Sequence, residues 1–402
     1  MTPPLFSIVI PTYNRSDLVQ KAVRSVLGQT FGDLEVVVSD NCSEDNTREV
    51  IEAFDDHRVR YVRTPRHTAI ADSWEFARTQ ARGSLLMLLS DDDAMVHDAL
   101  ERFADQHRRR DADFLFCNLA EYRDQSFLGP QKNTVNCRPF SGDSRLVSTD
   151  ELLKPLFAMR PTFNMHPSAF IFSAKIAERV VQRCGRFFAS NGVEYFAWPL
   201  AAVFSKHICY INAPLVILGR TNKSWGSMIV LSNPGKELID KMLADNDQNR
   251  DWVPLKNFTL TNLMAEGLLL GKKMFPEELR PYPFDEQQYL RRTMLELKGR
   301  VELGVDVRRE ICEVLTYAEK YPALKAELSA TDNGGPMGPN SSVRRLARTL
   351  RLNYVRRHVD TLKERRKIAR GEVKGGFTVS GDDFGFQDAL GCAEFISRVT
   401  AH

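Results

Sequence analysis

Apolar and polar positions alternate regularly over the first third of the chain. Short runs rich in β-branched and aliphatic residues are typical of buried strands, and they occur at residues 6–10, 34–40, 59–63, 85–89 and 112–122. Segments with apolar residues at helical spacing separate these runs, at residues 16–30, 46–54, 70–82 and 98–110. This alternation predicts an α/β fold, with a Rossmann-like, mostly parallel sheet flanked by helices.

The rest of the chain divides into regions of different composition. The stretch that follows the last predicted strand is irregular and rich in Pro, Asn and Phe, and the next hundred residues have a helical pattern. We therefore expect an additional, mainly α-helical C-terminal region. The predicted units are a first domain over 1–230 with halves 1–122 and 123–230, a helical region over 231–330, a linker over 331–342 and a basic helical region over 343–402.

Positive charge is concentrated near the C-terminus. The whole chain has a net charge of +3, whereas the stretch from Ser341 to Lys374 contains 12 Lys and Arg against 3 Asp and Glu. A basic amphipathic helix in this stretch would suit an anionic membrane surface. The alternative is a solvated helix packed on its own domain or on an acidic partner. No nucleic-acid-binding motif accompanies the arginines, so we expect no nucleic-acid partner.

The cysteine pattern and the hydropathy predict a cytoplasmic protein. The seven cysteines are scattered without a CxxC pair, which argues against a zinc ribbon and favours reduced thiols. The first residues lead directly into a strand without a signal-peptide pattern, and no apolar run reaches the ~18 residues of a transmembrane helix. We expect peripheral contact with the inner face of the plasma membrane through residues 343–370.

Three polar motifs follow strands of the predicted sheet. They are PTYNR (11–15), DNCSEDNT (40–47) and DDD (91–93), and parallel sheets bind ligands at this edge. Adjacent carboxylates repel one another, by about 4 kcal/mol for two charges ~4 Å apart near a surface, so three in a row favour a bound cation or full solvation. Since side chains at i and i+2 of an extended chain share a side, we expect Asp91 and Asp93 to face one ligand. Hard carboxylate oxygens suit Mg²⁺ or Mn²⁺.

The segments SIVIPTYNR, VVVSDNCSEDNT and ARGSLLMLLSDDDAM resemble, in order and spacing, those of the family 2 glycosyltransferases, which have the GT-A fold. The resemblance covers about residues 5 to 225. It implies a nucleotide-sugar donor, a divalent metal ion and an inverting displacement. The first domain would then be the catalytic domain, with a nucleotide-binding half and an acceptor half.

The resemblance also implies roles for individual residues. The last aspartate of the acidic motif commonly binds the metal ion and an earlier one approaches the ribose, so we expect Asp93 and Asp91 to form the metal site, with Asp92 assisting either. Asp40 would accept a hydrogen bond from a uracil or thymine ring, and Arg66 would approach the diphosphate. The segment that would lie along the nucleobase and ribose consists of Pro11, Thr12, Tyr13, Asn14 and Arg15.

Departures from the family pattern affect several positions. Asn41 and Cys42 stand where Asp and Gly are frequent, and Ala69 and Ser73 replace a frequent glycine and asparagine beside Arg66. Asn222 follows Arg220 where a histidine is frequent, which puts a histidine metal ligand there in doubt. His166 and Ser168 are expected either to line the acceptor site or to pack in the core.

The general base is expected downstream of the acidic motif. An inverting transfer needs a carboxylate to take the proton of the acceptor hydroxyl, and the family often places one at the start of a helix about a hundred residues later. Glu194 occupies this place in SNGVEYFAWPLAAV, although the family has aspartate more often. The apolar run that follows favours burial and a raised pKa. The alternative is a glutamate that only stabilises the helix N-terminus.

These observations predict a metal-dependent inverting glycosyltransferase with Mn²⁺ or Mg²⁺ as cofactor. The donor is expected to be a nucleotide-diphosphate sugar, a UDP-sugar first. The acceptor would be a glycan or a lipid-linked glycan of polysaccharide or cell-envelope synthesis. The alternatives are a nucleotide-sugar-binding protein without transferase activity and a nucleotidyltransferase, although PTYNRSD is not the glycine-rich loop of the latter.

Overall fold

The N-terminal part of the chain forms four parallel strands at one side of a large sheet. The computed structural model describes residues 3–127, 129, 131–231, 251–330, 367–368 and 376–400. The strands β1 (Phe6–Thr12), β2 (Leu34–Asp40), β3 (Val59–Arg63) and β4 (Leu85–Leu88) lie in the order β4-β1-β2-β3, all parallel. All seven residues of β2 are buried, which explains its continuous apolar run. The strands predicted here are confirmed.

The helices that connect these strands also lie where the sequence predicts them. They are α1 (Ser16–Leu27), α2 (Thr47–Glu52), α3 (Ile70–Thr79) and α4 (Ala99–Arg110). The apolar stripe of α1 is buried at Val19, Ala22, Val23 and Val26. Because each of α1, α2 and α3 leads back to the start of a parallel strand, β1, β2 and β4 all end at one edge of the sheet.

The other side of the sheet is mixed, so the prediction of a mostly parallel sheet is wrong for this part. Its strands pair mainly antiparallel, and β9 lies between β4 and β6, antiparallel to both. Strand β9 comes from the irregular stretch after residue 123, where no strand was predicted. These strands are β5 (Ala94–Met95), β6 (Phe114–Arg123), β7 (Thr134–Cys137), β8 (Ser144–Val147), β9 (Phe170–Ser173), β10 (Ile208–Arg220) and β11 (Phe377–Ser380).

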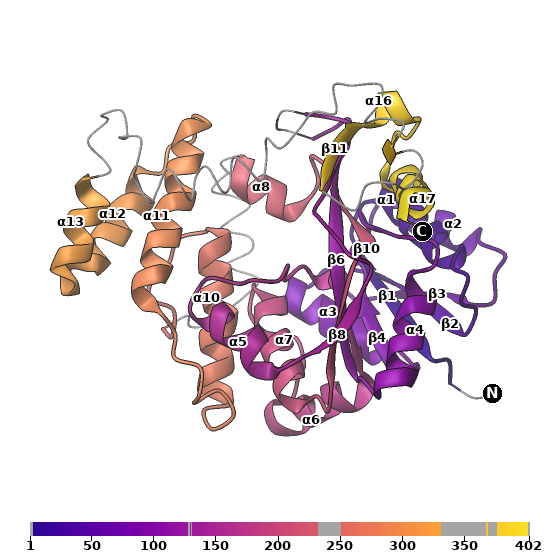
Figure 1. Ribbon diagram of the computed structural model, residues 1–402, viewed down its shortest axis with the longest axis horizontal. Coiled ribbons are helices and arrows are strands. Elements are labelled where there is room, and N and C mark those ends of the chain that lie inside the picture. Colours follow the sequence, from indigo (N-terminus) through magenta and orange to yellow (C-terminus); the bar gives the residue numbers. More distant parts are fainter. Residues whose placement is uncertain are drawn as a thin grey trace.

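The C-terminal residues return to the first domain. Strand β11 pairs with β7 at the edge of the sheet, and the helices α16 (Gly381–Phe384) and α17 (Ala389–Thr400) follow it (Figure 1). A second apolar cluster joins α17 to the sheet, and the amide of His97 donates to Ser397 Oγ at 2.9 Å. Residues 376–400 therefore add the edge strand of the large sheet and a helix packed against it. The predicted linker and the basic segment 343–370, apart from residues 367–368, lie outside the described residues.

Helices from the middle of the chain form a layer beside the sheet, on the left in Figure 1. The predicted helical region is confirmed where it is described, and it shares one continuous core with the sheet, for example through Leu268, Tyr289 and Trp198. None of the described helices combines the length and the apolar composition of a membrane span. The helices are α5 (Thr149–Phe157), α6 (Ala174–Cys184), α7 (Val193–Phe204), α8 (Trp225–Leu231), α10 (Leu260–Met274), α11 (Glu286–Glu302), α12 (Arg308–Tyr317) and α13 (Pro322–Ala330), with short 3-10 turns at Pro167–Ala169 and Ala318–Lys320.

Two glycines let α10 approach the start of α7 closely. A Cβ atom at Gly267 would lie 2.6 Å from the carbonyl oxygen of Gly192, and one at Gly192 would lie 2.1 Å from the carbonyl oxygen of Leu263. Side chains larger than hydrogen are therefore excluded from both positions at this spacing. The contact attaches the helical layer to the turn that presents Glu194.

We expect Gly267→Ala to lower the free energy of unfolding by about 1–3 kcal/mol, because the methyl group forces α10 away from α7. Urea-induced unfolding would measure the change. Gly299→Ala in α11 is the matched control, since no atom lies within 4 Å of its added Cβ, and it should be neutral or slightly stabilising. Equal stability of the two variants would contradict the close contact.

Candidate active site

A wide cleft of about 790 Å³ opens where β1 and β4 end. Its walls come from three parts of the chain: the turns after these strands, the 161–167 loop with the start of α7, and the helices α10 and α11. The predicted site residues on the cleft are Pro11, Thr12, Tyr13, Arg15, Asp91, Asp92 and Glu194. Asp40, Asn14, Arg66 and Asp93 are not among its lining residues.

The acidic motif forms a tight turn, so the extended backbone assumed for it is wrong. The amide of Asp93 donates to the carbonyl oxygen of Ser90 at 3.1 Å, which closes a turn over residues 90–93. In a turn, residues i and i+2 do not share a side. The three carboxylates consequently point to three different sets of partners, and Asp91 and Asp93 do not face one ligand.

Asp91 joins the turn after β4 to the segment after β1. Its carboxylate accepts from Thr12 Oγ1 and from Arg15 Nη1, both at 2.8 Å, and the side chain is only 4% exposed. Arg15 also donates to the carbonyl of Lys223, after β10. The ion pair neutralises one of the three negative charges and orders the predicted nucleotide-binding segment.

Asp92 is the second carboxylate on the cleft. Ser224 Oγ donates to its Oδ2 at 2.5 Å. Burial and the neighbouring Asp91 charge raise the pKa of Asp92, and Arg15 acts in the opposite direction. The carbonyl oxygen of Asp92 would lie 1.9 Å from a Cβ at Gly219, so only glycine fits beside this turn.

Asp93 points into the protein, away from the cleft. Its carboxylate accepts from Ser168 Oγ at 2.5 Å and from the amide of Gly219 at 2.8 Å, and it is 1% exposed. Burial first, and then the Asp92 charge, raise its pKa well above the usual value. Nδ1 of His166 lies 3.5 Å from the same carboxylate. Asp93 thus connects the end of β4 with the 167–169 turn and with β10.

In the segment predicted to bind the nucleobase, Asn41 and not the expected Asp40 lines the cleft. Asp40 is completely buried and accepts from Tyr61 Oη at 2.5 Å, from Arg63 Nη1 at 3.0 Å and from the amide of Ser43 at 2.8 Å. Its neighbour Asn41 lines the cleft instead. The sequence offers a signal for Asn41, because it stands in the same motif, although it departs from the family pattern there.

Rings line the cleft next to this region. Tyr13 and His67 lie with their ring centroids 4.3 Å apart, and both are on the cleft. His67 was not predicted as a site residue. Asn14 has a positive φ of 53° and its amide donates to Ser43 Oγ at 2.8 Å, so it orders the turn rather than the cleft surface. Arg66 is exposed to solvent.

Glu194 lies in the first turn of α7 and faces the same cleft as the acidic turn. Burial raises its pKa to about 7. His166 also lines the cleft, and burial together with the Arg220 charge lowers its pKa to about 3, so its imidazole is neutral. Arg220 lies 3.6 Å from Glu121, and Asn222 is exposed and does not line the cleft.

The donor set of the cleft fits a weakly held hard cation. Within the described ranges, no group of three or more His, Cys, Asp or Glu side chains is arranged to hold a metal ion. Mg²⁺ and Mn²⁺ need only one or two carboxylates when substrate phosphates supply further oxygens. Asp91 and Asp92 are the adjacent carboxylates on the cleft that meet this requirement.

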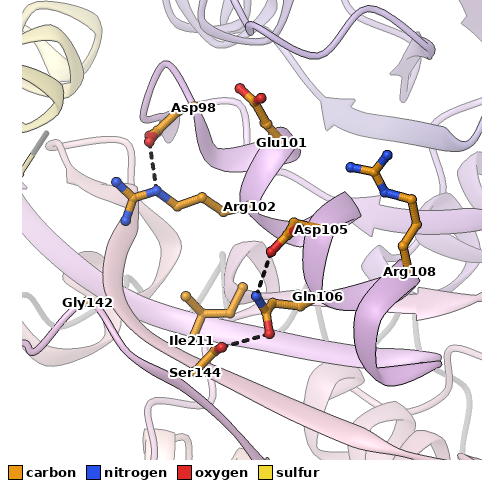
Figure 2. A pocket seen from close by; sticks show the side chains of 9 residues that line it. All are labelled: Asp98, Glu101, Arg102, Asp105, Gln106, Arg108, Gly142, Ser144 and Ile211. Atoms are coloured by element: carbon orange, nitrogen blue, oxygen red, sulfur yellow. Dashed lines mark hydrogen bonds and ion pairs between the residues drawn. The ribbon is translucent and has the colours of Figure 1, made fainter.

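A second, smaller hollow of about 280 Å³ lies beside α4 (Figure 2). Its polar side chains bond mostly to one another: Arg102 Nε donates to Asp98 at 2.7 Å, and Ser144 Oγ donates to Gln106 at 2.7 Å. No lining residue belongs to the predicted motifs. We therefore place the functional site in the larger cleft.

Comparisons with known proteins identify the family that this chain resembles. Residues 7–181 match the family described as Glycosyl transferase family 2. The chain is 35% identical over 100 residues to the GalNAc(5)-diNAcBac-PP-undecaprenol beta-1,3-glucosyltransferase of Campylobacter jejuni, covering 24% of this chain and 32% of that protein. It is 29% identical over 136 residues to the UDP-Glc:alpha-D-GlcNAc-diphosphoundecaprenol beta-1,3-glucosyltransferase WfgD of Escherichia coli, covering 33% and 54%. The chain thus spans about a third to a half of these relatives.

The fold is similar to that of a solved glycosyltransferase structure. Residues 1–349 of S. aureus TarS, in complex with UDP-GlcNAc, superpose with a TM-score of 0.50 and 15% identity. The match covers 84% of this chain and 93% of that one. It supports the predicted GT-A fold, an α/β sheet flanked by helices, over most of the chain.

The buried Asp93 contact leads to a stability prediction. We expect Ser168→Ala to cost about 1–3 kcal/mol, because the buried carboxyl group loses a hydrogen-bond partner that water cannot replace. Thr79→Ala is the control: this exposed hydroxyl bonds only to its near neighbours Phe76 and Gln80, so the change should stay within about 0.5 kcal/mol. Urea-induced unfolding would compare the two, and an equally small effect of both would show that the Asp93 contact does not stabilise the fold.

Proposed function

Since residues 7–181 belong to glycosyl transferase family 2, we propose that this protein transfers a sugar from a nucleotide-diphosphate donor to a hydroxyl group of a glycan or lipid-linked acceptor. The observation that carries the proposal is the position of Glu194, which faces the same cleft as the acidic turn. A UDP-sugar is the first candidate donor. Synthesis of a cell-surface polysaccharide is the corresponding process.

The donor would lie along the ends of β1 and β2. Tyr13 and His67 offer rings for the nucleobase. Asn41 would order the neighbouring segment, because its side-chain amide donates to the carbonyl of Thr68 and accepts from Thr64 and Thr68. Asp40 would act indirectly in this scheme, by holding Tyr61, Arg63 and the turn at Ser43. Thr12 and Arg15 would place Asp91 beside the ribose and diphosphate.

Asp91 and Asp92 would hold Mn²⁺ or Mg²⁺, in place of the expected pair of Asp93 and Asp91. The position of Asp93 argues against this role, since Asp93 does not line the cleft and Ser168 and Gly219 engage its buried carboxylate. When bound, the ion would neutralise negative charge on the leaving diphosphate. Asp93 would fix the backbone turn that carries Asp92.

Glu194 would act as the general base of an inverting displacement. The acceptor oxygen attacks the anomeric carbon while its proton passes to the Glu194 carboxylate. The bond between the anomeric carbon and the diphosphate oxygen breaks, and the nucleoside diphosphate leaves with the electron pair. An α-linked donor would give a β-linked product. A pKa of about 7 suits this role, because such a carboxylate is a stronger base than an exposed one.

We expect Glu194→Gln to lower kcat by about 10²–10⁴, the usual contribution of a general base, without changing donor affinity. Radiolabelled transfer and calorimetric titration with the donor would measure the two quantities. Glu121→Gln, on the same cleft but paired with Arg123 and Arg220, is the control and should retain far more activity. Turnover near the original rate in Glu194→Gln would remove Glu194 as the base and favour another carboxylate.

The raised pKa of Glu194 predicts a pH profile. Only the ionised carboxylate accepts the proton, so kcat should fall as the pH decreases through about 7, with a tenfold loss per unit well below it. The residual activity of Glu194→Gln should not show this decrease at low pH. Steady-state rates between pH 5.5 and 8.5 would test it, and a flat profile for the unmodified protein would argue against the assignment.

The metal assignment predicts a donor-dependent effect. After treatment with a chelator, a UDP-sugar should stabilise the protein only when Mn²⁺ or Mg²⁺ is added, by roughly 2.7 kcal/mol at a hundred times Kd. Asp92→Asn should abolish the metal-dependent part of the thermal shift, whereas Asp105→Asn on the outer face of α4 should preserve it. An unchanged shift in Asp92→Asn would contradict the role of Asp92.

A further inference from the structure

Two arginines of the cleft have no carboxylate partner among the described residues. Four arginines line the cleft, and the other two are near acidic groups: Arg15 is 2.8 Å from Asp91, and Arg220 is 3.6 Å from Glu121. Within the part of the chain that the structure describes, no carboxylate comes within ion-pair distance of Arg138 or Arg292. A cation on a cleft wall without a counter-charge favours an anionic ligand.

Arg292 is held in place by the helical layer. It lies on α11, half-buried, and its Nη1 donates to the carbonyl oxygen of Met159 at 3.2 Å. One turn later on α11, Glu296 accepts from the amides of Leu260 at 2.7 Å and Thr261 at 2.9 Å. These bonds fix the start of α10 against α11, so Arg292 has a defined position relative to the cleft. The remaining donors of its guanidinium are available to a ligand.

The surroundings of Arg292 strengthen an interaction with an anion. Leu260, Leu263 and Met264 form the adjacent wall of the cleft. Apolar side chains reduce the local dielectric constant, which increases the attraction between a guanidinium and an anion. Arg138, which follows β7 and is exposed, lines the same cleft, but no hydrogen bond among the described residues joins it to Arg292.

Arg292 lies toward the base rather than toward the acidic turn. Its helix α11 binds the first amides of α10, and α10 packs closely against Gly192 in the turn that presents Glu194. The donor diphosphate is assigned to the other end of the cleft, at Asp91 and Asp92. An anion bound at Arg292 would therefore belong to the molecule whose hydroxyl group Glu194 deprotonates.

We propose that Arg292 forms an anion-binding subsite for the acceptor, so that the acceptor carries a phosphate or carboxylate group near its reactive hydroxyl. This inference rests on the proposed glycosyl transfer and adds the chemical class of the acceptor. The geometry provides a planar guanidinium whose paired N–H groups match the oxygens of a phosphate or carboxylate. A neutral glycan would leave the positive charge of Arg292 without a partner.

Binding of matched sugar probes tests the subsite without requiring turnover. Glucose, glucose 6-phosphate and glucuronate would be titrated into the full chain in the presence of saturating UDP, with saturation-transfer NMR as the readout. We expect the phosphorylated and carboxylated probes to bind at least tenfold more tightly than glucose. Arg292→Gln should remove most of this preference, and Arg292→Lys should retain part of it, because the charge remains but the paired N–H groups are lost.

Arg291→Gln is the matched control. Arg291 precedes Arg292 on the same helix, but it is 2.9 Å from Glu327 and does not line the cleft. This variant should keep the full preference for charged probes. Equal binding of charged and neutral probes, no binding of any probe at tens of millimolar, or an unchanged preference in Arg292→Gln would each overturn the subsite.

Further comparisons distinguish a failure of the subsite from a failure of the proposed function, and they identify the source of the anion. Charge-dependent probe binding without transfer from any nucleotide sugar would support the subsite and count against the transferase. Transfer at equal rates to neutral and anionic acceptors, with no effect of Arg292→Gln on these rates, would support the transferase and contradict the subsite. A polyprenyl-phosphate-linked glucose in detergent that binds more tightly than glucose 6-phosphate would assign the anion to a lipid carrier, and equal binding would assign it to the glycan.

Discussion

Mutual repulsion among Asp91, Asp92 and Asp93 is the constraint around which the cleft is organised. Three adjacent carboxylates are compatible with a folded chain only when each has its own means of stabilisation. Arg15 and Thr12 bind the first, Ser224 binds the second, and Ser168 with the Gly219 amide binds the third. These partners come from β1, from the 167–169 turn and from the end of β10. Satisfying the carboxylates therefore assembles the walls of the cleft.

The helical layer is part of this cleft rather than an appendage. Close packing of Gly192 against α10 ties the turn before Glu194 to that helix, and Glu296 of α11 binds the first amides of α10. Leu260, Leu263 and Arg292 reach the cleft as a result. The wall of the cleft that we propose for the acceptor thus depends on residues far from the family motifs, which is where variation in acceptor choice would be expected.

Several parts of the fold were accessible from local pattern. The strands at 6–10, 34–40 and 85–89 are buried and rich in aliphatic residues, the strand at 59–63 is only partly buried, and the amphipathic helices between them follow a clear period. Strand β9 was missed because it is four residues long and antiparallel in a sheet that was expected to be mostly parallel. Strand β11 was missed because its partner β7 is more than two hundred residues away.

The sequence by itself determined where the cleft would open, because parallel strands end at one edge of their sheet and the polar motifs follow those strands. It also placed Glu194 in the first turn of a helix. Only the tertiary structure decided which side chains face the cleft: Asp92 and Asn41 rather than Asp93 and Asp40, together with His67 and Arg292. The physical reason is that the direction of a side chain depends on the turn that carries it and on partners distant in sequence, and neither is encoded in the local pattern of apolar and polar residues.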